Sequence, residues 1–189
     1  MLAEPGIRDH PLEYASRLQT RALDSIDLLV MHCTELPDLA TAREFGERVQ
    51  HADQQTGFSG HFYVDRDGSV HAYVPIDRIA HHTRGCNARS VGIELVNLGR
   101  FPDWFDSRRQ EMTEPYPSPQ IASLLALVGT LRAKLPALRW IAGHEDLDRG
   151  CVAASDAPGL QVFRKRDPGP RFPWQEVLGQ SGLERMHNV

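Results

Sequence analysis

The stretch Ile26-Asp27-Leu28-Leu29-Val30-Met31-His32-Cys33-Thr34 decides the fold that we expect for this chain of 189 residues. Residues 26–31 form a short and mostly apolar run, and its length and composition are typical of a β-strand buried inside a sheet. The apolar run stops at His32, so we expect this histidine at the end of the strand. Because loops bring distant residues together at the strand ends of α/β sheets, His32 is the first candidate for a functional residue.

A helix and a β-hairpin are predicted next. Asp38 can cap a helix that extends to about Gln50, because apolar residues recur there at helical spacing, at Leu39, Ala42, Phe45 and Val49. Residues 61–64 and 69–74 are then expected to form the two strands of a hairpin. The turn between them is Asp65-Arg66-Asp67-Gly68, in which Gly68 takes the position with positive φ.

The second half of the chain continues the alternation of strands and helices. Residues 90–97 are predicted to form a strand, and Glu94 faces away from its apolar residues Val91, Ile93 and Leu95. A helix opens at Ser118-Pro119 and ends before Pro136, with an apolar stripe at Ile121, Leu124, Leu125, Val128 and Leu131. Residues 138–142 are predicted to form a further short strand, directly before Gly143-His144.

These elements predict an α/β fold in a single domain, with a central mixed β-sheet flanked by helices and functional residues at the strand ends. We expect the domain to occupy residues 1–189, with a core from about 26 to 178 that ends in a short helix around Trp174 to Leu178. Residues 99–119 and 145–164 are expected to be loop insertions. The first contains several prolines and charges, and the second is rich in small residues.

Composition argues against several classes of protein. The chain has 41% hydrophobic and 24% charged residues and a formal net charge of -4, so it lacks the basic field of a general nucleic-acid binder. No apolar run is long enough to span a bilayer. The first ten residues lack the pattern of a secretory signal, so we expect a cytoplasmic protein, and a monomer. The scattered cysteines Cys33, Cys86 and Cys151 argue against a disulfide framework and against a thiolate zinc cluster.

His144, like His32, is predicted to follow a strand. Two neutral imidazoles and one carboxylate are suitable zinc ligands, and a site with three protein ligands leaves one position for water or a substrate carbonyl. Local spacing does not identify the third ligand, because such ligands would be far apart in the chain rather than in a His-x-x-x-His arrangement on one helix. From the residue pattern alone, both histidines could equally be hydrogen-bonded side chains at the edge of a sheet.

Five sequence blocks occur in a characteristic order. They are Val30-Met31-His32-Cys33-Thr34, Ser59-Gly60-His61-Phe62-Tyr63-Val64-Asp65-Arg66-Asp67-Gly68, Ser90-Val91-Gly92-Ile93-Glu94-Leu95-Val96-Asn97, Gly143-His144 and Lys165-Arg166-Asp167-Pro168-Gly169-Pro170. Together they resemble the type-2 N-acetylmuramoyl-L-alanine amidases, the AmpD-like family that includes phage lysozyme-amidases and is related to peptidoglycan recognition proteins. The resemblance extends from about Ile26 to Pro173 and implies that His32, His144 and Asp167 hold a catalytic Zn²⁺.

The resemblance also implies roles in cutting the amide between the lactyl group of muramic acid and L-alanine. Glu94 is the catalytic carboxylate that moves a proton, and Lys165 offers its positive charge to the oxyanion. His82 is expected to contact substrate, although its segment His81-His82-Thr83-Arg84-Gly85 departs from the His-Ala-Gly of many relatives. We also expect sugar hydroxyls or peptide carboxylates to be bound by Arg84, Asn87 and Arg89.

The expected partner is peptidoglycan or a muropeptide. Three alternatives to the favoured function stay open. The favoured role is recycling of anhydro-muropeptides, and the alternative role is that of a phage-type lytic amidase on intact peptidoglycan. The domain could also be a non-catalytic peptidoglycan-binding module, or a thiol hydrolase that uses Cys33. The prediction of Asp167 depends on its own motif, because the connection from Glu145 to Arg166 is longer than in short bacterial relatives.

Overall fold

Strand β2 (Leu28–Cys33) lies inside the central sheet of the computed structural model, which describes residues 6–187. Within this part of the chain the sheet has seven strands in the order β1-β4-β3-β5-β2-β6-β9. The other strands are β1 (Ile7–Asp9), β3 (Phe62–Val64), β4 (Val70–Ala72), β5 (Ser90–Leu95), β6 (Trp140–Gly143) and β9 (Glu184–Arg185). Strand β2 pairs in parallel with β5 and β6, whereas β3 and β4 form an antiparallel hairpin, so the sheet is mixed.

The continuous apolar sequence of β2 is explained by its position. All six of its residues are buried, as expected for a parallel strand that has neighbours on both edges and is covered on both faces. The predicted alternation of β5 is confirmed, because Val91, Ile93 and Leu95 belong to the main hydrophobic core. Glu94 therefore faces away from this core.

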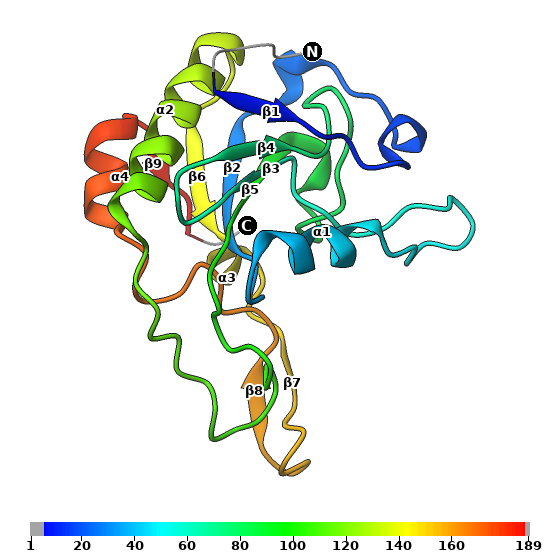
Figure 1. Ribbon diagram of the computed structural model, residues 1–189, viewed down its shortest axis with the longest axis vertical. Helices are drawn as coiled ribbons and strands as arrows, with labels where there is room; N and C mark the ends of the chain where they lie inside the picture. Colours follow the sequence, from blue (N-terminus) through cyan, green and yellow to red (C-terminus); the bar gives the residue numbers. More distant parts are fainter. Residues whose placement is uncertain (1–5, 188–189) are drawn as a thin grey trace.

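Helices flank the sheet, as expected for the α/β class. Helices α2 (Ser118–Lys134) and α4 (Trp174–Ser181) lie side by side along the sheet in Figure 1 and contact each other. The apolar stripe of α2 packs into the main core with β2, β3 and β5. Helix α1 (Leu39–Glu47) packs into a second core, which contains Leu12, Tyr14, Ala42 and Tyr63.

Local signals explain where these helices and turns begin. The side chain of Asp38 caps α1 by accepting a hydrogen bond of 2.7 Å from the backbone N–H of Thr41. Gly68 has a φ of 87° in the turn between β3 and β4, which confirms the predicted hairpin. Helix α1 ends at Glu47, earlier than expected, and the two apolar residues Phe45 and Val49 are exposed.

The second predicted loop insertion, residues 145–164, is not entirely irregular. It contains an antiparallel hairpin of β7 (Cys151–Ala153) and β8 (Gln161–Phe163), and this corrects the prediction of a loop. Each strand has three residues and only Val162 is buried, so neither strand has an apolar pattern long enough to be recognised in the sequence. The short edge strands β1 and β9 were missed for the same reason.

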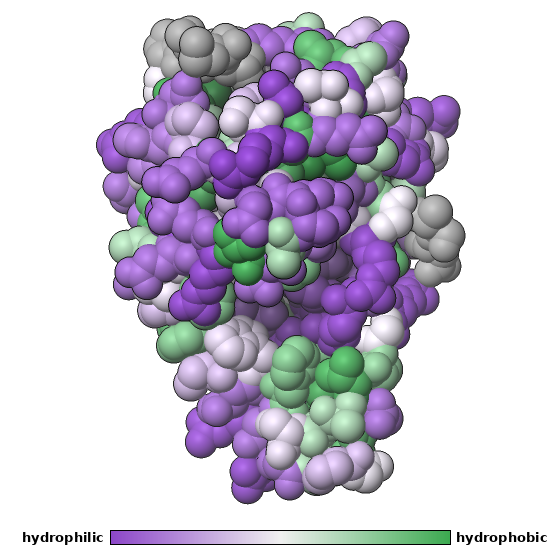
Figure 2. Space-filling view, turned by 90° about the vertical axis from the view of Figure 1, so that its right-hand side faces the viewer, coloured by the Kyte–Doolittle hydropathy of each residue, from purple (hydrophilic) through white to green (hydrophobic). Residues whose placement is uncertain are grey.

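The two insertions are joined by hydrogen bonds and form an arm, defined here as residues 99–117 and 148–165 (Figure 1, lower part). The backbone N–H of Ser155 donates to the carbonyl of Phe105 over 2.8 Å, and Arg100 donates to the carbonyl of Phe163 over 2.9 Å. Figure 2 shows hydrophobic side chains on this narrow part of the molecule, where Phe105, Leu160 and Phe163 are exposed.

The single domain is expected to occupy residues 1–189. Residues 1–5 and 188–189 of it lie outside the described part. No helix within residues 6–187 combines the length and the apolar character required to cross a bilayer.

Candidate metal centre

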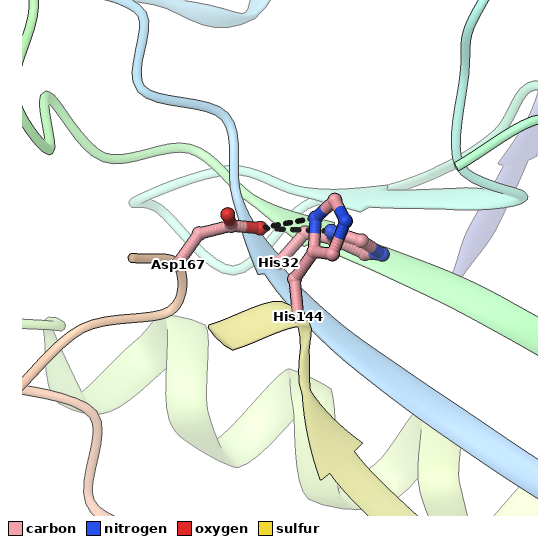
Figure 3. A group of neighbouring side chains, drawn as sticks. All are labelled: His32, His144 and Asp167. Atoms are coloured by element: carbon pink, nitrogen blue, oxygen red, sulfur yellow. Dashed lines mark hydrogen bonds and ion pairs between the residues drawn. The ribbon is translucent and has the colours of Figure 1, made fainter. Parts of the chain in front are cut away.

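Three side chains meet where strands β2 and β6 end, as Figure 3 shows: His32, His144 and Asp167. His32 is the last residue but one of β2, and His144 begins the short helix α3 (His144–Leu147) directly after β6. The parallel register pairs Met31 with Gly143, so the two histidines occupy equivalent positions one residue further along. The strand pairing therefore brings together two side chains that are far apart in the sequence.

Asp167 reaches the histidines from a loop that docks against the start of α3. The backbone N–H of Glu145 donates to the carbonyl of Asp167 over 2.9 Å. Gly143 permits this approach, because a Cβ at this position would lie 2.8 Å from the Cδ of Pro168. The Asp167 Oδ2 then lies 2.8 Å from His32 Nδ1 and 3.1 Å from His144 Nδ1.

The charge states of this cluster favour a cation. Burial lowers the pKa of His32 to about 4, despite the hydrogen bond with Asp167, so its imidazole is neutral at physiological pH. Burial alone would raise the pKa of Asp167, but the charge of His144 and the hydrogen-bond contacts with both histidines hold it well below its usual range. A neutral imidazole and an ionised carboxylate are the forms in which these side chains bind metal ions.

The donor set fits zinc. One ligand atom from each of the three residues lies within 4.8 Å of the others, and all three residues are buried. The second carboxylate oxygen, Asp167 Oδ1, is buried without a hydrogen-bond partner, so the carboxylate has unused acceptor capacity. Two imidazole nitrogens and a carboxylate oxygen form a ligand set that is typical of catalytic zinc.

Glu94 lies beside this cluster on the neighbouring strand β5. The parallel register pairs Glu94 with His32, and Glu94 Oε1 lies 4.0 Å from His32 Nδ1. Burial and, second, the negative charge of Asp167 raise the pKa of Glu94 to about 8. Gly60 leaves room for this side chain, because a Cβ there would lie 2.8 Å from the Cγ of Glu94.

A cavity of about 900 Å³ joins these residues to the remaining candidates. It is lined by the three possible ligands, by Glu94 and by Lys165. Lys165 is half-buried, and its positive charge acts on Glu94, lowering its pKa against the larger effect of burial. A carboxylate able to take up a proton and the cation Lys165 therefore line the same space as the possible metal ligands.

The four residues expected to bind substrate have different environments. Arg84 is exposed and lines the cavity. Asn87 and His82 also line it, and the Asn87 Oδ1 accepts hydrogen bonds from the backbone N–H groups of His82 and Thr83. Arg89 is not part of the lining, because its guanidinium is paired with both carboxylate oxygens of Asp27.

Sequence reasoning missed a buried ion pair next to the cavity. Arg100 Nε lies 2.6 Å from Glu35 Oε1, and Arg100 Nη2 lies 2.8 Å from Glu35 Oε2. Glu35 lies two residues after the end of β2 and has a φ of 50°, and Arg100 also donates to the carbonyl of Phe163 in β8. The pair thus connects the strand of His32 to the arm. No local signal in the sequence indicates it, because the partners are 65 residues apart.

Cys33 has the properties of a packing residue. Its side chain is buried, and burial, followed by the charge of Glu35, raises the pKa of the thiol well above its usual range. A reactive cysteine needs an accessible thiolate. This environment argues against the thiol hydrolase that the sequence left open.

One protein family matches most of the chain. Its sequence model, described as N-acetylmuramoyl-L-alanine amidase, covers residues 22–170, which include all the possible metal ligands. The 1,6-anhydro-N-acetylmuramyl-L-alanine amidase AmpD of Enterobacter cloacae is 34% identical over 120 residues, which are 59% of this chain and 50% of that protein. The chain thus spans about half the length of the curated AmpD relatives that it matches.

Two further matches cover a larger share of this chain and of the matched protein. The endolysin of Escherichia phage T7 is 27% identical over 139 residues, which are 72% of this chain and 86% of that protein. The structure of the N-acetylmuramoyl-L-alanine amidase LysC from Clostridium intestinale URNW is similar with a TM-score of 0.66 and 22% identity. This match covers 96% of the present chain and 100% of LysC, and it shows that the two share a fold.

Proposed function

Because the chain belongs to the N-acetylmuramoyl-L-alanine amidase family, we propose that it hydrolyses the amide between the lactyl group of N-acetylmuramic acid and L-alanine. In this proposal the enzyme is a zinc amidohydrolase, with Zn²⁺ held by His32, His144 and Asp167. Glu94 and Lys165 are its catalytic residues. The substrate is peptidoglycan or a soluble fragment of it.

The observation that carries the proposal is the convergence of five side chains on one cavity. Three possible metal ligands, a carboxylate with a raised pKa and a lysine line the same space. Amide hydrolysis needs an electrophile to polarise the carbonyl, a group to move a proton and a charge to stabilise the oxyanion. All five side chains come from one chain, so the proposed reaction does not require a second copy.

The chemistry divides between the metal and the protein. When bound, zinc supplies Lewis-acid polarisation of the scissile carbonyl and lowers the pKa of a water molecule. The three ligands would hold the ion, and all three residues are buried. Asp167, held ionised by the two histidines, neutralises part of the positive charge.

Glu94 is suited to move the proton. Its carboxylate is 4.0 Å from the metal-facing nitrogen of His32, and its raised pKa gives it a high affinity for a proton. A divalent cation in the triad would lower this pKa toward the pH of the cell, where a carboxylate can both accept and return a proton. Glu94 would therefore take the proton from the attacking water and deliver it to the nitrogen of the departing L-alanine.

Lys165 is suited to stabilise negative charge. Lys165 is a half-buried residue of the loop that also carries Asp167, and it lines the cavity with the ligands. A preorganised charge is more effective than solvent in stabilising an oxyanion, because it needs no reorganisation during the reaction. On the same cavity, Arg84 is available to bind a peptide carboxylate.

For the substrate we favour soluble anhydro-muropeptides in cell-wall recycling, which would have the enzyme act in the cytoplasm. Support comes from the AmpD of Enterobacter cloacae, named for the 1,6-anhydro-N-acetylmuramyl substrate and 34% identical to this chain. The alternative is a lytic amidase on intact peptidoglycan. It is supported by the match to the T7 endolysin, which covers 86% of that protein.

One experiment tests the activity and separates the two substrates. The purified protein is incubated either with soluble anhydro-muramyl peptide or with intact sacculi, and released peptide is measured by mass spectrometry. We expect release of peptides with a free L-alanine amino terminus, and faster turnover of the soluble substrate. Rapid cleavage of sacculi with slow cleavage of the soluble compound would contradict the recycling role and favour the lytic one.

Zinc dependence and catalysis need separate controls. Removal of zinc by a chelator should abolish the reaction, and added Zn²⁺ should restore it. Full activity after complete zinc depletion would contradict the proposed metal centre. Absence of peptide release from either substrate, together with retained binding of both, would support the non-catalytic peptidoglycan-binding module instead.

A further inference from the structure

His82 contacts the metal-site residue His32 from the side opposite Asp167. The two imidazole rings meet edge to face, with centroids 5.2 Å apart and an interplanar angle of 89°. His32 Nε2 lies 3.0 Å from His82 Nδ1, whereas His32 Nδ1 faces Asp167. The ring of His32 is therefore held at both of its nitrogens.

The hydrogen bonds around His82 define which of its nitrogens carries the proton. The hydroxyl of Ser90 donates to the carbonyl of Cys86 over 2.8 Å. Because a hydroxyl has a single proton, the Ser90 Oγ must accept from His82 Nε2, which is 3.2 Å away. His82 Nδ1 then has a lone pair, and this lone pair can accept a hydrogen bond from the Nε2–H of His32.

The surrounding backbone fixes the ring of His82 in this position. A Cβ on Gly92 of strand β5 would lie 2.6 Å from the Cγ of His82, so the ring packs directly on the backbone of the strand. Asn87 holds the adjacent turn by accepting from the N–H groups of His82 and Thr83, over 3.1 and 2.7 Å. The Thr83 hydroxyl lies 3.0 Å from His82 Nδ1 and 3.3 Å from His32 Nε2, so its oxygen can accept from the same His32 N–H.

We propose that His82 is a positioning residue for the metal centre: it accepts a hydrogen bond from the Nε2–H of His32 and so keeps the lone pair of His32 Nδ1 directed at the metal. The inference rests on the zinc site proposed above. The ring nitrogen that binds a metal is set by the hydrogen bond that the other nitrogen makes. Here that partner is a second histidine, whose own tautomer is set by Ser90.

Two substitutions of similar size test this role. His82→Leu removes the acceptor, whereas His82→Asn keeps an oxygen at the position of Nδ1. Zinc affinity of each protein is measured by competition with a chelating dye. We expect His82→Leu to bind Zn²⁺ about 10- to 100-fold more weakly than the wild type, and His82→Asn to recover most of this loss.

A spectroscopic readout distinguishes positioning from a general loss of structure. In the zinc-loaded protein, nitrogen-15 NMR of the imidazoles should show His82 with its proton on Nε2 and a hydrogen-bonded Nε2 proton on His32. The hydrogen-bonded His32 signal should persist in His82→Asn and be lost in His82→Leu. A proton on His82 Nδ1 in the wild type would overturn the inference.

The controls separate this inference from the proposed function. A wild-type protein that does not bind zinc would overturn the proposed metal centre itself. If the wild type binds zinc and His82→Leu binds it with equal affinity, only the role of His82 is overturned. Should His82→Leu fail to fold, Ser90→Ala decides instead, because it removes only the group that sets the tautomer of His82. Weaker zinc binding by Ser90→Ala supports the inference, and unchanged binding contradicts it.

Discussion

Glu94 and His32 are opposite each other in the register of two parallel strands, with Glu94 Oε1 4.0 Å from His32 Nδ1. Both side chains point away from the main core, because the neighbouring residues Met31, Ile93 and Leu95 fill it. The pairing gives a buried carboxylate a fixed place beside a histidine that we propose as a metal ligand.

Glu94→Gln should abolish turnover without loss of zinc. Glutamine keeps the size of the side chain but cannot move a proton, so we expect peptide release to slow by about 100- to 10,000-fold. Zinc content and muropeptide binding should remain at the wild-type level. The matched control is Glu44→Gln on the exposed side of α1, which should leave the rate unchanged. A Glu94→Gln enzyme with near wild-type rate would exclude Glu94 as the proton carrier.

The raised pKa of Glu94 predicts a pH-dependent stability of the metal-free protein. Folding raises this pKa from 4.5 to about 8, so the folded state binds the proton more tightly than the unfolded state. The free energy of unfolding should therefore fall as pH rises from about 4.5 to about 8. Urea unfolding at both ends of this range should show a larger decrease for the wild type than for Glu94→Gln. Equal decreases would contradict the raised pKa.

Zinc should stabilise the fold through the triad. A ligand that binds only the folded state adds about 2.7 kcal/mol to the free energy of unfolding at 100 times its Kd. We expect the melting temperature to rise with added Zn²⁺ and to fall with a chelator. In Asp167→Asn this zinc-dependent gain should vanish, although the side chain stays nearly the same size. A gain that persists in this variant would indicate that zinc binds elsewhere.

The buried pair of Arg100 and Glu35 should be important for stability. Arg100→Ala leaves the Glu35 carboxylate buried without its partner, and such a loss costs about 3–5 kcal/mol. Chemical unfolding measures this cost. Arg139→Ala breaks the exposed pair with Glu184 and serves as the control, with an expected loss below about 1 kcal/mol. Similar losses in the two variants would show that the buried pair has no special role.

Gly60→Ala should impair catalysis through Glu94. The added Cβ would lie 2.8 Å from the Cγ of Glu94, so the side chain of Glu94 must leave its present position beside His32. We expect a lower kcat with unchanged zinc affinity. Gly129→Ala in α2 is the control, because no atom lies within 4 Å of its added Cβ, and alanine favours the helix. Unchanged kcat in Gly60→Ala would show that the position of Glu94 tolerates this shift.

The elements that the sequence predicted are those with a strong local signal. Strand β2 is a mostly apolar run, α2 has an apolar stripe and a proline in its first turn, and the β3–β4 turn contains Gly68. Each of these signals depends only on residues close together in the chain. The three-residue strands β7 and β8 give no such signal, because pairing with each other rather than their own composition makes them strands.

The sequence by itself determined the α/β class, the strand-end position of His32 and the chemical character of the candidate ligands. Their residue types and motif blocks are local properties of the chain. Only the tertiary structure decided which atoms meet: the Nδ1 atoms of His32 and His144 at Asp167, His82 behind His32, and Arg100 at Glu35. These contacts depend on strand register and loop docking, which are set by packing between segments far apart in the sequence.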